Sequence, residues 1–241
     1  MRTLLVLVMV LPSCARWSAA PTPMTAVRDE LGHPAKCLVV FLPGAGDVAA
    51  DFERHGFFEE VRQRNLSVDL VAADATFGYY SRGITVERVH EDVVTPQLAR
   101  GYAQVWVMGM SMGGLGTLLY AKEHAHEVHG VLALAPFLGD AKLLDELRAA
   151  GGLKAWRAEP GGDYQRELWR WLQATTSGAP GPELYLGWGT EDRLGRSAEV
   201  LAAALPPEHV FTVPGGHKWT TWRVLLARFL DASDFKAACG G

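Results

Sequence analysis

A serine flanked by glycines lies where an apolar run gives way to an amphipathic one. Gly109, Ser111 and Gly113 form a G-x-S-x-G pattern between residues 105–108 and 114–127. Between a strand and a helix, this pattern predicts a tight turn that exposes the serine hydroxyl as a nucleophile. Side chains at the glycine positions would crowd such a turn, and the N-terminus of the next helix favours developing negative charge. A purely structural glycine-rich turn is the alternative.

The serine needs a base, because its free hydroxyl is a weak nucleophile. Of the eight histidines, His217 has the most suitable position, in a glycine-bounded turn after the apolar residues 210–213. Site residues of an α/β sheet lie at such carboxyl ends of strands. A capping histidine for the next helix is the alternative. His124, His126 and His129 also lie close together, but we interpret them as a solvated helix end and expect no metal.

A carboxylate must hold the base in the correct tautomer and stabilise its protonated form. Asp192 follows the apolar run 184–188 and is the best candidate, with Glu191 as its close rival. A charge on a surface turn is the alternative for either residue. We therefore expect Ser111, Asp192 and His217 to meet, since each follows an apolar run.

A tetrahedral intermediate at the serine would also need hydrogen-bond donors, and the loss of one such donor typically costs about 10²–10³ in rate. We expect one donor to be the backbone N–H of Met112, the residue after the nucleophile. We place the other at Ala45 in the small-residue turn 42–47, with Gly44 or Gly46 as rivals. A bare strand-to-helix turn is the alternative.

The elements that must position these residues alternate along the chain. Short apolar runs predict buried strands and amphipathic segments predict helices. The alternation indicates an α/β domain with a mainly parallel sheet of about six strands flanked by helices. The predicted strands cover residues 38–42, 68–73, 105–108, 131–134, 184–188 and 210–213. The predicted helices cover about 48–64, 84–100 (kinked or divided at Pro96), 114–127, 197–205 and 219–230.

The segment 137–182 is longer than one crossover needs. It predicts helices over 141–150 and 164–173, separated by stretches rich in glycine and proline. We interpret it as a small helical cap insert over the strand ends, within a single domain of residues 21–241. Ordinary helices packed on the face of the sheet are the alternative.

Composition narrows the classes of function. The chain has 241 residues, of which 49% are hydrophobic and 21% charged, with a formal net charge of −4. This is globular composition without the basic field of a nucleic-acid binder. Cys14, Cys37 and Cys239 are too few for a disulfide framework, and no CxxC motif is present. The sequence leaves open whether Cys37 and Cys239 pair, and leaves the oligomeric state open.

Residues 1–20 resemble a targeting signal. Arg2 precedes the apolar run 4–11, which is too short to cross a bilayer and suits the core of a signal peptide. Residues 11–14 resemble a bacterial lipobox, which predicts a lipid-modified Cys14 and membrane anchoring. Cleavage for ordinary secretion at the small residues 18–20 is one alternative, and an uncleaved N-terminus or a misplaced start codon is the other. Either cleavage predicts a protein that is secreted, periplasmic or anchored to the bacterial envelope.

Between about residues 37 and 230 the sequence resembles an α/β-hydrolase of the serine esterase, thioesterase and peptidase type. Its motifs are the turn 42–47, similar to an HGxGD-like turn with Pro43 in place of the histidine, together with Gly109 to Gly113, Gly189 to Asp192 and Gly215 to His217. Residues 216–222 resemble the GxHxWxxW ending of esterase-D-like and mycolyltransferase-like proteins. Ser, Asp, His is also the chain order of the triad in this fold. Few residues precede residue 38, so the family's usual first two strands are expected to be missing or replaced.

The resemblance implies acyl transfer to water through an acyl-enzyme, with Ser111 as nucleophile, His217 as base and Asp192 as its partner, and without metal or cofactor. The implied substrate is a small-molecule carboxylic ester or thioester. A serine peptidase or an acyltransferase would share the triad, and a non-catalytic binding protein on the same scaffold is a further alternative. Candidate pocket residues are aromatic, with core packing as their alternative role: Tyr79, Tyr80, Phe137 and Trp219.

Overall fold

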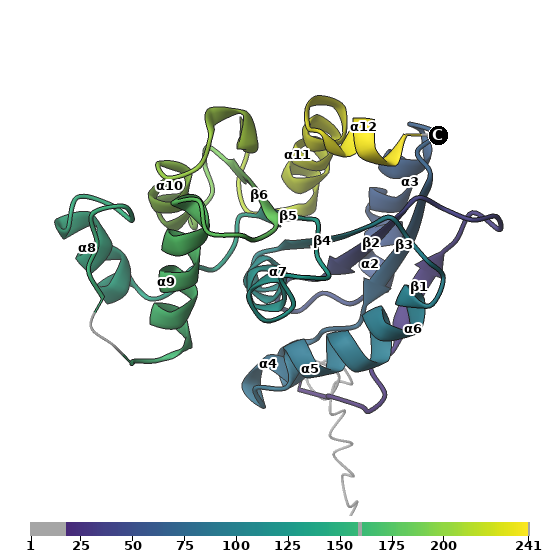
Figure 1. Cartoon of the computed structure of the whole chain (residues 1–241), viewed down its shortest axis with the longest axis horizontal. Coiled ribbons are helices and arrows are strands. Elements are labelled where there is room, and N and C mark those ends of the chain that lie inside the picture. Colours follow the sequence, from purple (N-terminus) through teal and green to yellow (C-terminus); the bar gives the residue numbers. More distant parts are fainter. Residues whose placement is uncertain (1–17, 159–160, 241) are drawn as a thin grey trace, which may run out of the picture.

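A computed structural model describes residues 18–158 and 161–240. Its strands form one sheet of seven in the order β1-β3-β2-β4-β5-β6-β7, in which β1 is antiparallel to β3 and all other neighbours are parallel (Figure 1). The predicted mainly parallel α/β sheet is therefore confirmed. Cys14 and most of the expected targeting segment lie outside the described residues.

The six predicted strands are all present. They are β2 (Cys37–Leu42), β3 (Val68–Ala73), β4 (Gln104–Met110), β5 (Gly130–Leu134), β6 (Glu183–Gly189) and β7 (Val210–Val213). Every residue of β2, β3 and β5 is buried, which explains their unbroken apolar runs. The additional strand β1 (Ala26–Asp29) lies at the edge of the sheet. This strand was not predicted, because four residues are too few to show a period.

The helices follow the predicted segments with two main differences. The segment 48–64 divides into two helices at Gly56, whose φ of 77° is unfavourable for other residues. The segment 84–100 contains six residues of π-helix before Pro96. The described helices are α2 (Ala50–Arg54), α3 (Phe57–Arg62), α4 (Phe77–Ser81), α5 (Thr85–Arg88), the π-helix η1 (Val89–Val94), α6 (Thr95–Leu98), α7 (Met112–Glu123), α8 (Ala141–Ala149), α9 (Tyr164–Thr176), α10 (Gly195–Ala202), the 3₁₀ helix η2 (Pro207–His209), α11 (Trp219–Ala232) and α12 (Phe235–Cys239).

Helices cover both faces of the sheet. α3, α11 and α12 lie on one face, and α7 with the α4–α6 segment lies on the other (Figure 1). In the segment between β5 and β6, α8 packs against α10 and α9 packs against α7. In residues 18–158 and 161–240, no helix combines the length and apolar character needed to span a bilayer.

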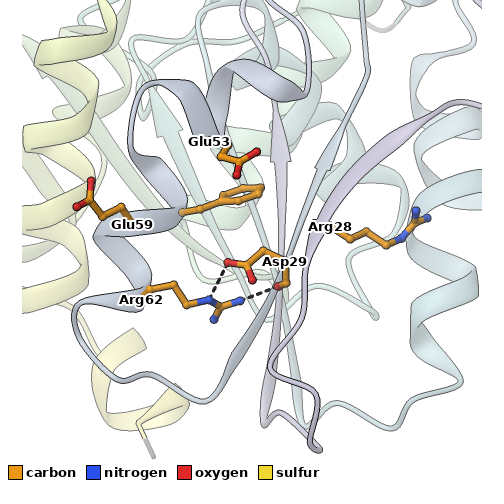
Figure 2. Close-up of a pocket in the computed structure, with 6 residues that line it drawn as sticks. Arg28, Asp29, Glu53, Glu59 and Arg62 are labelled. Carbon is orange, nitrogen blue, oxygen red and sulfur yellow. Dashed lines mark hydrogen bonds and ion pairs between the residues drawn. The ribbon is translucent and has the colours of Figure 1, made fainter.

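The edge of the sheet is held by one arginine. Arg62 of α3 has its Nε 2.7 Å from the Asp29 carboxylate, and its Nη2 donates to the Asp29 carbonyl at 2.6 Å (Figure 2). Its Nη1 donates to the carbonyl of Val68 in β3 at 2.7 Å. One guanidinium therefore joins α3, β1 and β3. A cavity of about 320 Å³ beside it is bordered mainly by charged side chains and contains none of the candidate site residues.

A disulfide between Cys37 and Cys239 joins the first residue of β2 to the end of α12, with a Cα–Cα distance of 5.6 Å. Both cysteines are fully buried. The pairing that the sequence left open is thus present, and it fixes the C-terminal helix against the centre of the sheet.

Candidate active site

Ser111 lies in the tight turn between β4 and α7, where its φ of 55° is uncommon for a residue with a side chain. A Cβ at Gly109 would lie 2.4 Å from the carbonyl oxygen of Gly113, and a Cβ at Gly113 would lie 2.0 Å from that of Leu42. Both glycines are therefore required, because the first turn of α7 lies directly on the ends of β4 and β2. The predicted steric reason for the G-x-S-x-G pattern is present in the structure.

Three loops bring a serine, a histidine and an aspartate into hydrogen-bond contact. Ser111 Oγ lies 2.9 Å from His217 Nε2, and His217 Nδ1 lies 2.9 Å from each carboxylate oxygen of Asp192. With Nδ1 protonated, the imidazole donates to Asp192 and accepts from the serine hydroxyl. The loops follow β4, β6 and β7, so the contact forms at the carboxyl edge of the parallel sheet.

Asp192, and not Glu191, faces the imidazole. The Asp192 side chain is fully buried, and one of its oxygens also accepts the backbone N–H of Leu194 at 2.8 Å. Glu191 is exposed, and its backbone N–H donates to Gly215 at 3.0 Å. A buried carboxylate with these contacts can hold the imidazole in a fixed orientation.

The two predicted oxyanion donors flank Ser111. Met112 is the first residue of α7, so its N–H has no acceptor within the helix. Gly44 is so close to the nucleophile that a Cβ there would lie 3.5 Å from the Ser111 Cβ. Ala45 is the next residue and is exposed, and among the described residues its N–H has no hydrogen-bond acceptor. Both amides are therefore free to bind an oxygen of a ligand at Ser111.

A cavity of about 780 Å³ opens at Ser111. Ala45 and Met112 line it together with two of the predicted pocket aromatics, Tyr80 and Phe137. Further lining residues were not selected from the sequence, and they come from α5, α7, α9 and the loop after Asp192: Thr85, Val86, Leu115, Leu119, Tyr164, Arg193 and Leu194. The apolar members of α7 follow a helical spacing, but the sequence could not show that this face of the helix is open rather than covered.

The other two predicted pocket aromatics lie elsewhere. Tyr79 is fully buried away from the cavity, and its hydroxyl donates to the Pro21 carbonyl at 2.6 Å. Adjacent residues on a helix point in different directions, so Tyr80 lines the cavity and Tyr79 does not. Trp219 also lies outside the cavity lining, with its ring stacked on His55 at 4.6 Å between centroids.

Trp219 instead supports the turn that carries Ala45. Its Nε1 donates to an oxygen of Asp47 at 3.2 Å. Burial raises the pKa of the Asp47 carboxyl, and the hydrogen bond from Trp219 only partly offsets that effect. The interaction joins the turn after β2 to the first residue of α11, two positions after His217.

Two residues of the cavity lining, Tyr80 and Thr85, carry buried hydroxyls. The oxygens of Tyr80 and Thr85 are inaccessible to solvent, and neither makes a hydrogen bond within the described residues. Burial also raises the pKa of Tyr80, so its hydroxyl is protonated at neutral pH. An unpaired buried hydroxyl costs about 1–3 kcal/mol. Because both oxygens are covered, that cost falls on the stability of the folded protein rather than on ligand binding.

Comparison with known proteins places the chain in a family. The model of the Esterase family, described as "Putative esterase", matches residues 92–232, a range that contains Ser111, Asp192 and His217. The chain belongs to this esterase family. It is accordingly a hydrolase of the carboxylesterase type, and esters of small molecules are its class of substrate. A search of curated proteins by sequence gave no match.

Solved structures show the same fold at low sequence identity. MPT51 of Mycobacterium tuberculosis has a TM-score of 0.61 at 14% identity, covering 88% of this chain and 94% of its own. An S-formylglutathione hydrolase of Staphylococcus aureus has a TM-score of 0.56 at 16% identity, covering 82% and 80%. A ferulic acid esterase has a TM-score of 0.57 at 13% identity, covering 86% and 96%. The esterase therefore has the α/β-hydrolase fold that its motifs predicted.

Proposed function

We propose that this esterase cleaves carboxylic esters by nucleophilic catalysis at Ser111. The observation that carries the proposal is the continuous chain of contacts from Ser111 Oγ through His217 to Asp192, with 2.9 Å at each step. A serine beside an oriented imidazole is the arrangement that activates a hydroxyl for attack. The position of Ser111 at the mouth of a cavity gives a substrate access to it.

The reaction follows from the contacts. As Ser111 Oγ attacks the ester carbonyl carbon, its proton passes to His217 Nε2, and the carbonyl electron pair moves onto the oxygen. The amides of Ala45 and Met112 donate to that oxyanion. Collapse of the intermediate breaks the bond to the alcohol, which takes the proton from His217 and leaves an acyl-serine. Water then attacks the acyl-serine with His217 again as base, releasing the carboxylic acid and restoring the serine. Asp192 stabilises the protonated imidazole in both halves.

The cavity suggests a largely apolar substrate with one hydrogen-bonding group. Leu115, Leu119 and Phe137 offer apolar surface, whereas the exposed side chains of Tyr164 and Arg193 belong to the same lining and can bind a polar atom. An aromatic ester that carries a ring hydroxyl or ether would satisfy both features. The fold neighbour described as a ferulic acid esterase makes esters of hydroxylated aromatic acids reasonable first substrates to test.

A serine-directed fluorophosphonate probe tests the proposal. The folded wild-type protein should incorporate one probe per chain, and Ser111→Ala should incorporate none while it unfolds at a similar temperature. A panel of p-nitrophenyl esters of graded chain length, with hydroxylated aromatic esters, thioesters and aminoacyl amides alongside, should then rank the substrates. Failure of folded wild type to react with the probe and with every panel member would overturn the proposal and favour a non-catalytic binding protein.

We also infer that the protein acts outside the cytoplasm. The Cys37–Cys239 disulfide supports this, because disulfides persist mainly in oxidising compartments. Thr76 Oγ1 donates to the Ala19 carbonyl at 2.7 Å, a contact that cleavage after residue 20 would remove and cleavage before Cys14 would retain. This favours the lipidated form. Mass spectrometry of the mature N-terminus would distinguish an acylated Cys14 from a chain that begins near Pro21.

A further inference from the structure

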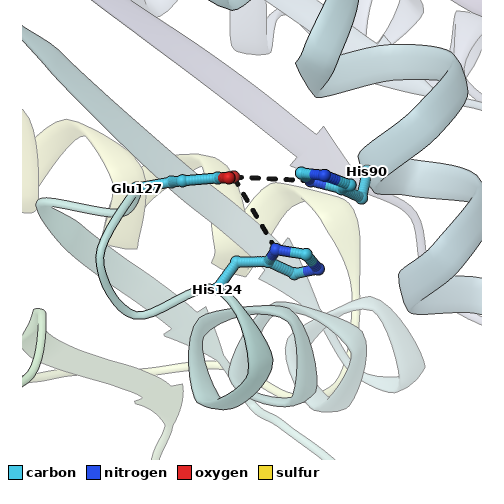
Figure 3. Close-up of side chains that lie close together, drawn as sticks. All are labelled: His90, His124 and Glu127. Carbon is cyan, nitrogen blue, oxygen red and sulfur yellow. Dashed lines mark ion pairs between the residues drawn. The ribbon is translucent and has the colours of Figure 1, made fainter.

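Two histidines and a glutamate from separate segments lie together near the C-terminal end of α7. His90 belongs to η1, whereas His124 and Glu127 follow α7 (Figure 3). One ligand atom of each residue lies within 4.8 Å of those of the other two. We call these three residues the histidine cluster. None of them lines the cavity at Ser111.

The spacing of the cluster is close to that around a metal ion. The Nδ1 atoms of His90 and His124 lie 3.4 Å and 3.8 Å from the same carboxylate oxygen of Glu127. A tetrahedral zinc ion with bonds of about 2.0–2.1 Å holds its ligand atoms about 3.3–3.4 Å apart. Of the three pairs, His90–Glu127 already has this separation and His124–Glu127 needs a shift of about 0.5 Å, within the reach of side-chain rotation. The ligand atoms of the third pair, His90 and His124, lie within 4.8 Å of each other.

The surroundings supply the hydrogen bonds that metal ligands usually make. His90 Nε2 lies 3.4 Å from Thr95 Oγ1, which can accept its N–H when Nδ1 faces an ion. The Tyr120 hydroxyl donates to Glu127 Oε2 at 3.2 Å and also lies 3.2 Å from His90 Nδ1. Metal-binding histidines commonly donate their second ring N–H to an acceptor, and metal-binding carboxylates are themselves hydrogen-bonded. Thr95 meets the first requirement for His90, and Tyr120 meets the second for Glu127.

The cluster can open toward an ion. The imidazoles of His90 and His124 are now stacked at 3.9 Å between centroids, with 15° between their planes. The nitrogen lone pairs of two stacked imidazoles lie in nearly parallel planes, so the two rings cannot both point at one ion in this arrangement. Binding therefore requires the rings to rotate apart about the side-chain torsion angle χ2, which is only weakly restricted in histidine. The side chains of His90, His124 and Glu127 are 26%, 19% and 17% exposed, which leaves a path for the ion and for a water ligand.

We propose that the histidine cluster binds a divalent transition metal ion of the Zn²⁺ class. Two imidazoles and one carboxylate are a donor set that such ions favour over Mg²⁺ or Ca²⁺. The ion would join η1 to the end of α7, the helix whose first turn follows Ser111. Val86 of α5, which directly precedes η1, and Leu119 of α7 both line the cavity at Ser111. The site is thus separate from the triad and independent of the proposed esterase mechanism.

Zinc binding to the whole mature protein tests this proposal. After chelator treatment and dialysis, titration calorimetry and elemental analysis should show one Zn²⁺ per chain, and the melting temperature should rise with zinc concentration. Co²⁺ in place of Zn²⁺ should give the intense visible bands of four-coordinate N/O ligation. Wild type that binds no zinc below millimolar concentration would overturn the proposal without any variant.

Variants assign the site. His90→Gln with His124→Gln should weaken zinc binding at least 100-fold, and Thr95→Val should weaken it about 10- to 100-fold. His33→Ala, a histidine change remote in sequence from the cluster, and His217→Ala, at the proposed active site, should bind zinc like wild type. Unchanged stoichiometric binding in the folded double variant, or loss of binding in His217→Ala alone, would place the ion elsewhere and refute the proposal. If the double variant does not fold, Thr95→Val and the Co²⁺ spectrum of wild type decide.

Discussion

The proposed triad and the histidine cluster both combine imidazole with carboxylate, but the groups beside this pair differ. At the triad, one imidazole lies between the fully buried Asp192 carboxylate and the hydroxyl of Ser111. In the cluster, two imidazoles share the partly exposed carboxylate of Glu127, and the neighbouring hydroxyl belongs to Tyr120. The same two chemical groups are therefore present in two different settings.

The position of each hydroxyl in the fold explains the different chemistry that we expect at the two places. Ser111 is held on a turn with positive φ, at a cavity and beside free amides. Tyr120 lies within α7 and its side chain is buried. This burial, together with the nearby Glu127 carboxylate, raises the pKa of the Tyr120 hydroxyl. A phenol that keeps its proton and does not line the cavity at Ser111 can donate a hydrogen bond but is not placed to attack a substrate there. An imidazole–carboxylate pair thus acts as a base only where the chain presents a nucleophile to it.

Removal of the His217 imidazole should have the largest effect, because it should abolish most ester hydrolysis without changing zinc binding at the histidine cluster. His217→Ala should lower kcat for the best ester by about 10⁵–10⁶, because it removes the imidazole that is in contact with Ser111 Oγ and would accept its proton. Its zinc affinity should equal that of wild type. Steady-state kinetics and calorimetry on one preparation measure both. A His217→Ala enzyme with more than a tenth of wild-type kcat would contradict the role of the triad.

The partner of the base should matter next. Asp192→Asn should lower kcat by about 10⁴, since the imidazole would adopt the wrong tautomer and its charge would be uncompensated. Glu191→Gln is the matched control on the adjacent, exposed residue and should stay within about threefold of wild type. Rate measurements on both variants check the ranking. The reverse order would assign the carboxylate role to Glu191.

The unpaired hydroxyls of Tyr80 and Thr85 should affect stability rather than the reaction. Thr85→Val and Tyr80→Phe should leave KM within about threefold of wild type for polar and aliphatic esters, because neither oxygen is accessible to a ligand. The melting temperature of the free enzyme should stay constant or rise, since an unpaired buried hydroxyl costs about 1–3 kcal/mol. A tenfold rise in KM that is confined to esters with a polar ring substituent would show instead that one of these hydroxyls reaches the substrate.

The smallest effect is expected at the turn that carries Ala45. Burial raises the pKa of Asp47 above its ordinary value of 3.8, so the folded state favours the protonated carboxyl and loses stability as pH rises through the raised pKa. Asp47→Asn removes this cost and can still accept the Trp219 N–H. Its melting temperature should exceed that of wild type by about 2 °C at pH 7, with the difference closing below about pH 4. Thermal unfolding across pH measures this, and a less stable variant at pH 7 would contradict it.

The features that sequence predicted are those encoded locally. Buried strands produce unbroken apolar runs, and Gly109, Gly113 and Gly215 mark turns whose geometry tolerates no other residue. Since parallel strands end at a common edge, turns after three of them predicted that Ser111, Asp192 and His217 would meet. The same reasoning predicted the edge of the sheet at which the site lies, but it could not predict where each side chain points. Tyr79 and Trp219 were for this reason predicted to line the cavity, which only Tyr80 and Phe137 of the four aromatic candidates do.

The features that sequence did not predict depend on contacts between distant segments. β1 forms because Ala26–Asp29 can pair with β3 and be held by Arg62, neither of which leaves a local pattern. The histidine cluster was hidden for the same reason. His124 was visible beside His126 and His129, but its actual partner His90 lies 34 positions away and reaches it only through the packing of η1 near α7.

The Cys37–Cys239 bond closes a covalent ring across a separation of 202 positions, and this ring contains all three residues of the proposed triad. A protease that cuts once in the exposed stretch 177–181 would leave Ser111 on one fragment and Asp192 with His217 on the other. The two fragments would still be linked at the far end of the sheet. A nicked enzyme should therefore stay assembled, and should separate into two bands on a denaturing gel only after reduction.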